Sequence, residues 1–170
     1  LDFANHTNGA VTAYLRYNPD YSNPTSGVFA QRQSVDSELQ CLTPTDFSMY
    51  DESDVEHVGW YYLPVQAKEA IWISPYMNEN INIYMISYVV PLFAEDGTSI
   101  GIVGMDIDFS QITDLVDETT VYQSGYAFLT DASGSIMHHK NVDEGTVITD
   151  LDSSLKKGAD FLAEDGNQGK

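Results

Sequence analysis

The sequence predicts a mixed α/β protein of the α+β kind, in which an antiparallel sheet is flanked by helices. Three apolar runs between residues 70 and 109 are separated by turn-forming segments, which indicates consecutive antiparallel strands. A segment with helical spacing follows the last run, and a further strand–turn–strand pattern begins near Ser124. The chain has 170 residues and is 42% hydrophobic, so it is long enough and apolar enough to bury a core.

The first element expected is a β-hairpin with a long loop. Residues 11–19 ("VTAYLRYNP") and 28–34 ("VFAQRQS") have strand composition, and the turn formers of "DYSNPTSG" separate them. A short helix should follow, because Ser53 and Glu56 are spaced as a capping box and Pro64 would end the helix. The aromatic residues at its C-terminal end would be Trp60, Tyr61 and Tyr62.

A β-meander is predicted by the three runs that come next: residues 70–76 ("AIWISPY"), 81–93 ("INIYMISYVVPLF") and 98–109 ("TSIGIVGMDIDF"). Turns are expected between them at "MNEN" and "AEDG". Asp108 precedes "FSQITDLVDET", where apolar residues recur at helical spacing. We therefore interpret Asp108 as the N-cap of a helix.

Asp106 is harder to explain by packing alone. In a strand it shares one face with Ile100, Ile102, Gly104 and Asp108, so its carboxylate follows a stripe that is expected to be buried. No lysine or arginine occurs from Glu69 to His139, so Asp106 has no counter-ion nearby in the sequence. A buried carboxylate without a partner is costly, which favours a cation, a donor network or a metal at this face. The alternative is that Asp106 caps a loop or accepts backbone N–H bonds.

A second module of similar build is predicted after the helix. Residues 126–140 ("YAFLTDASGSIMHHK") repeat the pattern of an apolar strand, an Asp and Gly turn and a second strand. Only that hairpin and a helix-like stretch at residues 150–166 fit before the chain ends, so the second module is expected to be incomplete. The expected domains are residues 1–118 and 119–170. The start without methionine and the end at "EDGNQGK" are typical of an excised segment.

Composition and motifs exclude several classes of function. With 26 acidic and 7 basic residues the net charge is -19, which disfavours nucleic acid and anionic membranes as partners and favours cations. Cys41 stands alone, so an intrachain disulfide or CxxC pair is excluded. His138 and His139 are adjacent on a strand and point to opposite faces, so we expect no metal site there. Because GxSxG, GxxxxGK[ST] and GxGxxG are absent, no catalysis and no cofactor are expected of this chain.

Four segments together resemble the double Cache (dCache_1) sensor family: "GWYYLPVQAKEAIWISPY", "MISYVVPLF", "GIVGMDIDF" and "SGYAFLTDASGSIMHH". The resemblance covers roughly residues 11–150. Members are extracytoplasmic ligand-sensing regions of membrane histidine kinases, chemotaxis receptors and nucleotide-cyclase receptors, built from two PAS-like modules on a long N-terminal helix. The resemblance implies a membrane-anchored parent protein, with this part outside the cytoplasm. It also implies that the long helix is lost or precedes Leu1, and that helix would offer a route to a homodimer.

In the amino-acid-binding branch of that family, an Arg two residues before a Trp-Tyr pair binds the ligand carboxylate, and a later Tyr and an Asp complete the pocket at the ligand amine. In this sequence Val58 replaces the Arg, and Ser53 replaces a Tyr expected five residues further upstream. The resemblance therefore implies a pocket that keeps its amine half and lacks its carboxylate half. The matching residues, which are the candidate ligand-binding residues, are Trp60, Tyr61, Tyr76 and Asp106.

The residue types fit an ammonium group, because aromatic faces attract a cation and a carboxylate supplies the counter-charge. Without the resemblance, such aromatic residues are more often found in a core. The resulting hypothesis is a non-catalytic extracytoplasmic sensor domain that binds an amine-bearing small molecule. Its ligand would bias a two-state equilibrium and signal to a cytoplasmic output such as a histidine kinase. Two alternatives stay open: a module that binds calcium or another cation through Asp106 and Asp108, and a structural dimerisation domain without a ligand.

Overall fold

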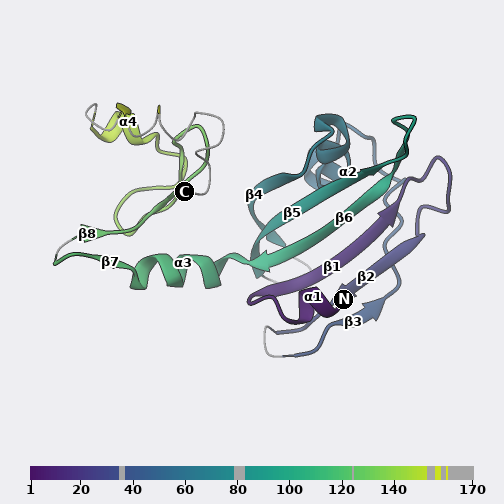
Figure 1. The fold of residues 1–170 in the computed structure, drawn as a ribbon, viewed down its shortest axis with the longest axis horizontal. Helices are drawn as coiled ribbons and strands as arrows, with labels where there is room; N and C mark the ends of the chain where they lie inside the picture. Colours follow the sequence, from purple (N-terminus) through teal and green to yellow (C-terminus); the bar gives the residue numbers. More distant parts are fainter. Residues whose placement is uncertain (35–36, 79–82, 124, 153–155, 158–159, 161–170) are drawn as a thin grey trace. The chain divides into compact units, whose positions relative to one another are not determined.

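A computed structural model describes residues 1–34, 37–78, 83–123, 125–152, 156–157 and 160 of the chain (Figure 1). The chain divides into two compact units between Gln111 and Ile112, which lie inside helix α3 (Phe109–Glu118). The assignment of functional modules to residues 1–118 and 119–170 stays a prediction.

An antiparallel sheet of six strands forms the first unit, in the order β3-β2-β1-β6-β5-β4 (Figure 1). The expected hairpin is confirmed as β1 with β2, and the expected meander is confirmed as β4, β5 and β6. β1 pairs with β6, so the hairpin and the meander join into one sheet with β6 near its centre. The strands are β1 (Ala10–Tyr17), β2 (Gly27–Gln31), β3 (Gln40–Leu42), β4 (Ile71–Asn78), β5 (Ile83–Phe93) and β6 (Ser99–Asp108).

The prediction of a turn at residues 77–80 is wrong for its first two residues. Met77 and Asn78 continue β4, because they still pair with Tyr84 and Ile83 of β5. The rest of the expected turn lies outside the described residues. A short helix, α1 (Asp2–Asn5), precedes β1 and was not expected.

Helix α2 (Val55–Ala67) starts and ends elsewhere than the sequence predicts. Its N-cap is Asp54, whose side chain accepts a hydrogen bond from the His57 N–H at 3.2 Å. Ser53 is engaged differently, because its N–H and its hydroxyl both donate to Asp51. Pro64 does not end the helix; its ring removes one N–H from the helix, but its side chain is fully buried and so is held by packing. The helix ends at Ala67, and its aromatic residues therefore lie in its middle.

The alternation expected along β6 is confirmed. Ile102, Gly104 and Asp106 are buried, whereas Val103 between them is exposed. The expectation is wrong at the start of the strand, where Ile100 is exposed and Gly101 is buried, because the pairing with β5 shifts register there. The capping role of Asp108 is confirmed, since its Oδ1 accepts a hydrogen bond from the Ser110 N–H at 2.9 Å. β6 therefore leads directly into α3.

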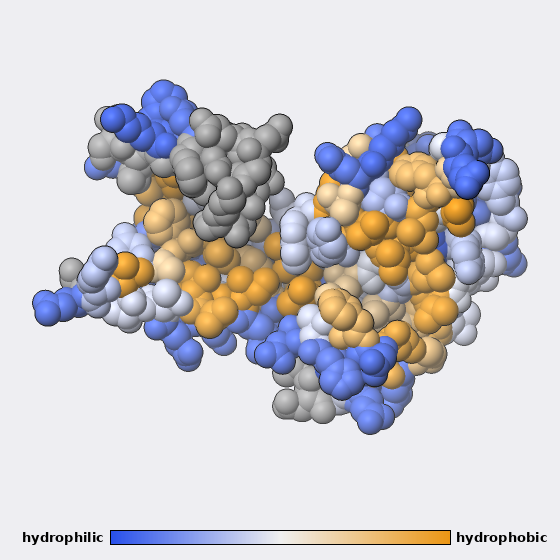
Figure 2. All heavy atoms as spheres, viewed as in Figure 1, coloured by the Kyte–Doolittle hydropathy of each residue, from blue (hydrophilic) through white to orange (hydrophobic). Residues whose placement is uncertain are grey.

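The core of the first unit lies between α2 and one face of the sheet. Val58 and Tyr61 of α2 pack there with the buried residues Tyr14, Phe47, Val89 and Ile102. Apolar side chains also gather over the sheet in the view of Figure 2. Trp72 and Tyr88, which pair across β4 and β5, are exposed on the face opposite to the core, with ring centroids 4.8 Å apart. Strand alternation thus gives the sheet one face for the core and one apolar outer face.

The second unit contains short elements. The hairpin expected within residues 126–140 is confirmed as β9 with β10, and Asp131 fixes its turn by accepting N–H bonds from Ser133 and Ser135. Of the helix expected at residues 150–166, α4 covers only the start, and most of the remainder lies outside the described residues. The elements after α3 are β7 (Thr120–Val121), β8 (Gly125–Tyr126), β9 (Leu129–Thr130), β10 (Ile136–His138) and α4 (Ile148–Leu151).

Candidate ligand-binding site

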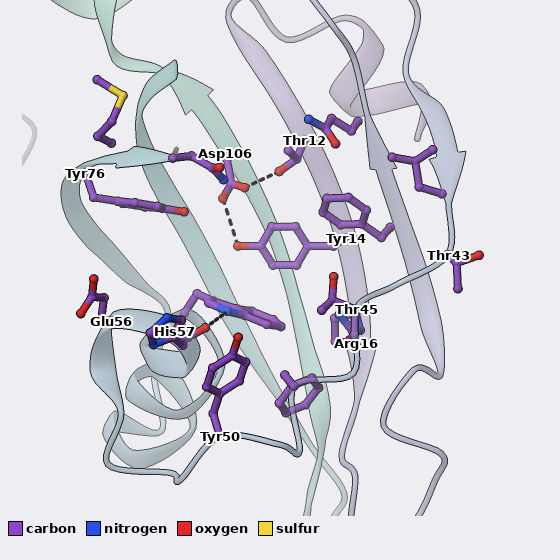
Figure 3. Close-up of a pocket in the computed structure, with 17 residues that line it drawn as sticks. Thr12, Tyr14, Arg16, Thr43, Thr45, Tyr50, Glu56, His57, Tyr76 and Asp106 are labelled. Atoms are coloured by element: carbon purple, nitrogen blue, oxygen red, sulfur yellow. Dashed lines mark hydrogen bonds between the residues drawn. The ribbon is translucent and has the colours of Figure 1, made fainter. Parts of the chain in front are cut away.

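A cavity of about 700 Å³ opens in the first unit (Figure 3). Its lining comes from strands β1, β2, β3, β4 and β6, from α2, and from the segment that joins β3 to α2. This volume lies within the range of pockets that enclose small molecules. The cavity is therefore large enough for a metabolite.

Asp106 lies at one side of this cavity and is 6% exposed. It pairs with Thr12 of β1 on one side and with Ser87 of β5 on the other, so all three side chains share the pocket face of the sheet. The Thr12 hydroxyl donates a hydrogen bond to Asp106 Oδ2, and the Tyr14 hydroxyl donates to Oδ1 at 3.1 Å (Figure 3). The carboxylate is thus oriented by hydroxyl groups.

Burial raises the pKa of Asp106, while the hydrogen bonds from Thr12, Ser87 and Tyr14 lower it. Burial, and then the charge of Asp106, raises the pKa of Tyr14 well above its usual range. The same two causes raise the pKa of Tyr76 to about 12. Both tyrosines are therefore neutral at neutral pH. No ion pair within 4.0 Å reaches Asp106 from the part of the chain that the structure describes.

Trp60 and Tyr76 line the same cavity as Asp106. The Trp60 ring meets Tyr14 edge-on at 5.6 Å, and its Nε1–H donates to the His57 carbonyl at 2.8 Å, which fixes the indole. Tyr76 reaches in from β4, and its hydroxyl lies 3.4 Å from Ser87 Oγ. The structure therefore brings together three of the four residues that the sequence singled out.

Tyr61, the fourth, is placed elsewhere. It is 2% exposed, belongs to the core, and is not among the described residues that line the cavity. Neighbouring helix positions point about 100° apart, and on α2 Trp60 faces the cavity while Tyr61 faces the core. Val58, at the position of the family's Arg, is also fully buried in the core.

Arg16 of β1 lines the cavity, and sequence reasoning missed it. It is 3% exposed, and its Nη2 donates to the carbonyls of Pro24 and Thr45, each at 2.6 Å. The guanidinium lies 5.0 Å from the Phe47 ring centroid and 5.7 Å from that of Trp60. Burial lowers the pKa of Arg16, and attraction to Asp46 partly offsets this. The signal was in the sequence, because Thr12, Tyr14 and Arg16 form a polar face on an otherwise apolar strand.

The described residues hold no group of three or more His, Cys, Asp or Glu side chains arranged to bind a metal ion. None of the helices formed by these residues has the length and apolar character needed to span a bilayer.

Known proteins are similar in sequence to this chain over most of its length. Residues 2–114 match the family described as methyl-accepting chemotaxis protein-like, first PDC sensor domain. The chain is 24% identical over 124 residues to the methyl-accepting chemotaxis protein PctB of Pseudomonas aeruginosa, which covers 73% of this chain and 18% of PctB. It is 29% identical over 127 residues to McpC of Bacillus subtilis, which covers 71% of this chain and 19% of McpC. The chain thus spans about a fifth of the length of these relatives.

Solved sensor domains share its fold. The extracellular domain of mmHK1S-Z2, classed provisionally as a histidine kinase, matches with a TM-score of 0.64 and 22% identity, over 95% of this chain and 64% of that one. The sensory domain of the Campylobacter jejuni chemoreceptor Tlp3, with isoleucine bound, matches with a TM-score of 0.53 and 20% identity, over 87% of this chain and 53% of that one. These likenesses confirm the expected fold. With the match over residues 2–114, they show that the chain is a sensor domain and belongs to the family of first PDC sensor domains of methyl-accepting chemotaxis protein-like receptors.

Proposed function

We propose that the first unit binds a small amine-bearing metabolite, with Asp106 as its counter-ion and Trp60 and Tyr76 as aromatic wall. The observation that carries this proposal is a buried carboxylate that faces the cavity and is held by neutral hydroxyl groups. Such hydrogen bonds orient the carboxylate but do not neutralise it. An ammonium group would supply the missing positive charge and would gain from the aromatic faces.

The likeness to receptors suggests what binding would achieve. Tlp3, whose sensory domain was solved with isoleucine, shows that this fold accommodates an amine-bearing metabolite in another protein. For the present chain we propose a two-state equilibrium that the ligand biases toward one arrangement. The whole protein would be a membrane-anchored receptor, with this domain outside the cytoplasm and a chemotaxis or histidine kinase output inside.

The test compares Asp106→Asn with Asp108→Asn by isothermal titration calorimetry against a panel of primary amines, amino acids and quaternary ammonium compounds. Removing one partner of a buried charge pair costs about 2 kcal/mol or more, so Asp106→Asn should lose about thirtyfold or more in affinity. Asp108→Asn is the matched control, because Asn also caps helices well and its affinity should stay near that of the wild type. Circular dichroism of both variants is the control for folding.

Two results would contradict the proposal. One is equal affinity of the wild type and Asp106→Asn for the ligand that the wild type binds best. The other is a preferred ligand that is purely anionic, because the carboxylate would repel it.

A further inference from the structure

The cavity has a second charged side chain, Arg16, at a distance from Asp106. Thr12, Tyr14 and Arg16 occupy every second position of β1 and so lie on the same face, and Thr12 lies beside Asp106. Arg16 lies four positions after Thr12 along the strand, which places their Cα atoms about 13 Å apart. In Figure 3, Asp106 and Arg16 lie on opposite sides of the Tyr14 ring. The cavity therefore has an acidic end and a basic end.

Neither charge is matched by a protein group of opposite charge in contact with it. Within the described residues, no ion pair within 4.0 Å involves Asp106 or Arg16. The polar contacts of Arg16 are carbonyl oxygens, and its buried Nε has no hydrogen-bond partner in the part of the chain that is described. Asp46 attracts Arg16 but forms no ion pair with it within 4.0 Å. Burying a charge without a counter-charge in contact is costly, and here two opposite charges are buried apart in one cavity.

We propose that Arg16 binds an anionic group of the ligand, so that the ligand is a zwitterion whose amine and anionic group are separated by a spacer of several atoms. This inference rests on the proposed function, because Asp106 holds the amine end. An α-amino acid with an uncharged side chain carries both groups on one carbon and cannot reach both ends of the cavity. The rings of Tyr14 and Trp60 lie between the two ends, in contact with each other, and offer an apolar surface to the spacer.

Calorimetry with matched ligand pairs tests this on the unmodified domain. The pairs are n-alkylamines and ω-amino acids of equal chain length, from 3-aminopropanoate to 8-aminooctanoate. Alpha-amino acids of similar size with uncharged side chains are titrated alongside. Charge-assisted hydrogen bonds to a guanidinium are strong, so at one or more of the longer lengths the ω-amino acid should bind about tenfold or more tighter than its alkylamine. The α-amino acids should show no such gain over amines of their size.

The outcomes separate this inference from the function on which it rests. If alkylamines bind through Asp106 and the carboxylate adds nothing at any length, Arg16 has no ligand role and the proposed function stands. If the α-amino acids bind as tightly as the best ω-amino acid, the inferred separation between the amine and the anionic group of the ligand is wrong. If no amine and no amino acid binds, both proposals fall.

Substitutions then test whether Arg16 is the residue that gives the ω-amino acid its higher affinity. Arg16→Met should abolish the advantage of the ω-amino acid over the alkylamine of equal length, whereas Arg16→Lys should keep part of that advantage. The matched control is Arg32→Met, because Arg32 is also buried, at 6% exposure, and donates to the Ala4 carbonyl, but is not among the described lining residues. An Arg16→Met domain that folds and retains the full advantage would overturn the inference. If it does not fold, the ligand series on the wild type decides.

Discussion

Replacing Gly104 of β6 by alanine should disturb the pocket, because the new methyl group would push against Tyr14. Gly104 lies opposite Tyr14 across β1 and β6, and an added Cβ would overlap Tyr14 Cε2 and lie 2.5 Å from Cζ and 2.7 Å from the hydroxyl oxygen. Carbon atoms in contact prefer about 3.5–4.0 Å, so the ring would have to move by about 1 Å. Tyr14 is buried against Trp60 and donates to Asp106, so this movement would disturb both contacts.

The free energy follows from these two effects. Overpacking costs about 1–3 kcal/mol, and the loss of a hydrogen bond to a charged group costs about 1.5–3 kcal/mol. Gly104→Ala should therefore lower the free energy of unfolding by about 2.5–6 kcal/mol, as measured by urea denaturation. In a Tyr14→Val background the ring is gone, so the same substitution should cost much less. A cost below about 0.5 kcal/mol in the wild type, or an equal cost in both backgrounds, would refute this reasoning.

The remaining predictions concern charge and capping. Because the folded state raises the pKa of Asp106 above 3.8, the native protein binds this proton more tightly than the unfolded chain, and stability from this group falls as pH rises through the folded pKa. The neutral variant Asp106→Asn should therefore gain stability relative to the wild type as pH is raised from about 4 to about 7.5 in denaturation without ligand, and a relative loss would contradict this. At α2, Asp54→Ala should lower the thermal midpoint more than Ser53→Ala, because only Asp54 accepts the His57 N–H; equal shifts would restore Ser53 as the cap.

Sequence reasoning succeeded where the deciding interactions are local. The meander of residues 70–109 is formed by strands that follow one another, so turn formers and alternation specify it. Asp108 caps a helix that starts at the next residue, and this too is visible in a short window. Pro64 shows the limit of local rules, because its missing N–H was outweighed by the burial of its side chain, which depends on the tertiary fold.

The candidate site was found in part for the same reason. The resemblance identified Trp60, Tyr76 and Asp106, but the groups that hold the carboxylate, Thr12 and Tyr14, are more than 90 residues away in the sequence. Only the pairing of β1 with β6 brings them together. The lack of basic residues near Asp106 in the sequence was likewise a poor guide, since Arg16 reaches the same cavity from β1.

The direct passage from β6 into α3 has a mechanical consequence. Asp106 and Ile112, the first residue of the second unit, are joined through the last residues of a strand and the first turn of a helix. In this fully described stretch no loop intervenes, because Asp108 ends the strand and Phe109 begins the helix. Hinges are commonly the end residues of an element, so Asp108 and Phe109 are the positions whose dihedral angles would change if a ligand displaced Asp106 along its strand. The hydrogen bond from the Ser110 N–H to Asp108 lies at that point and would report such a change.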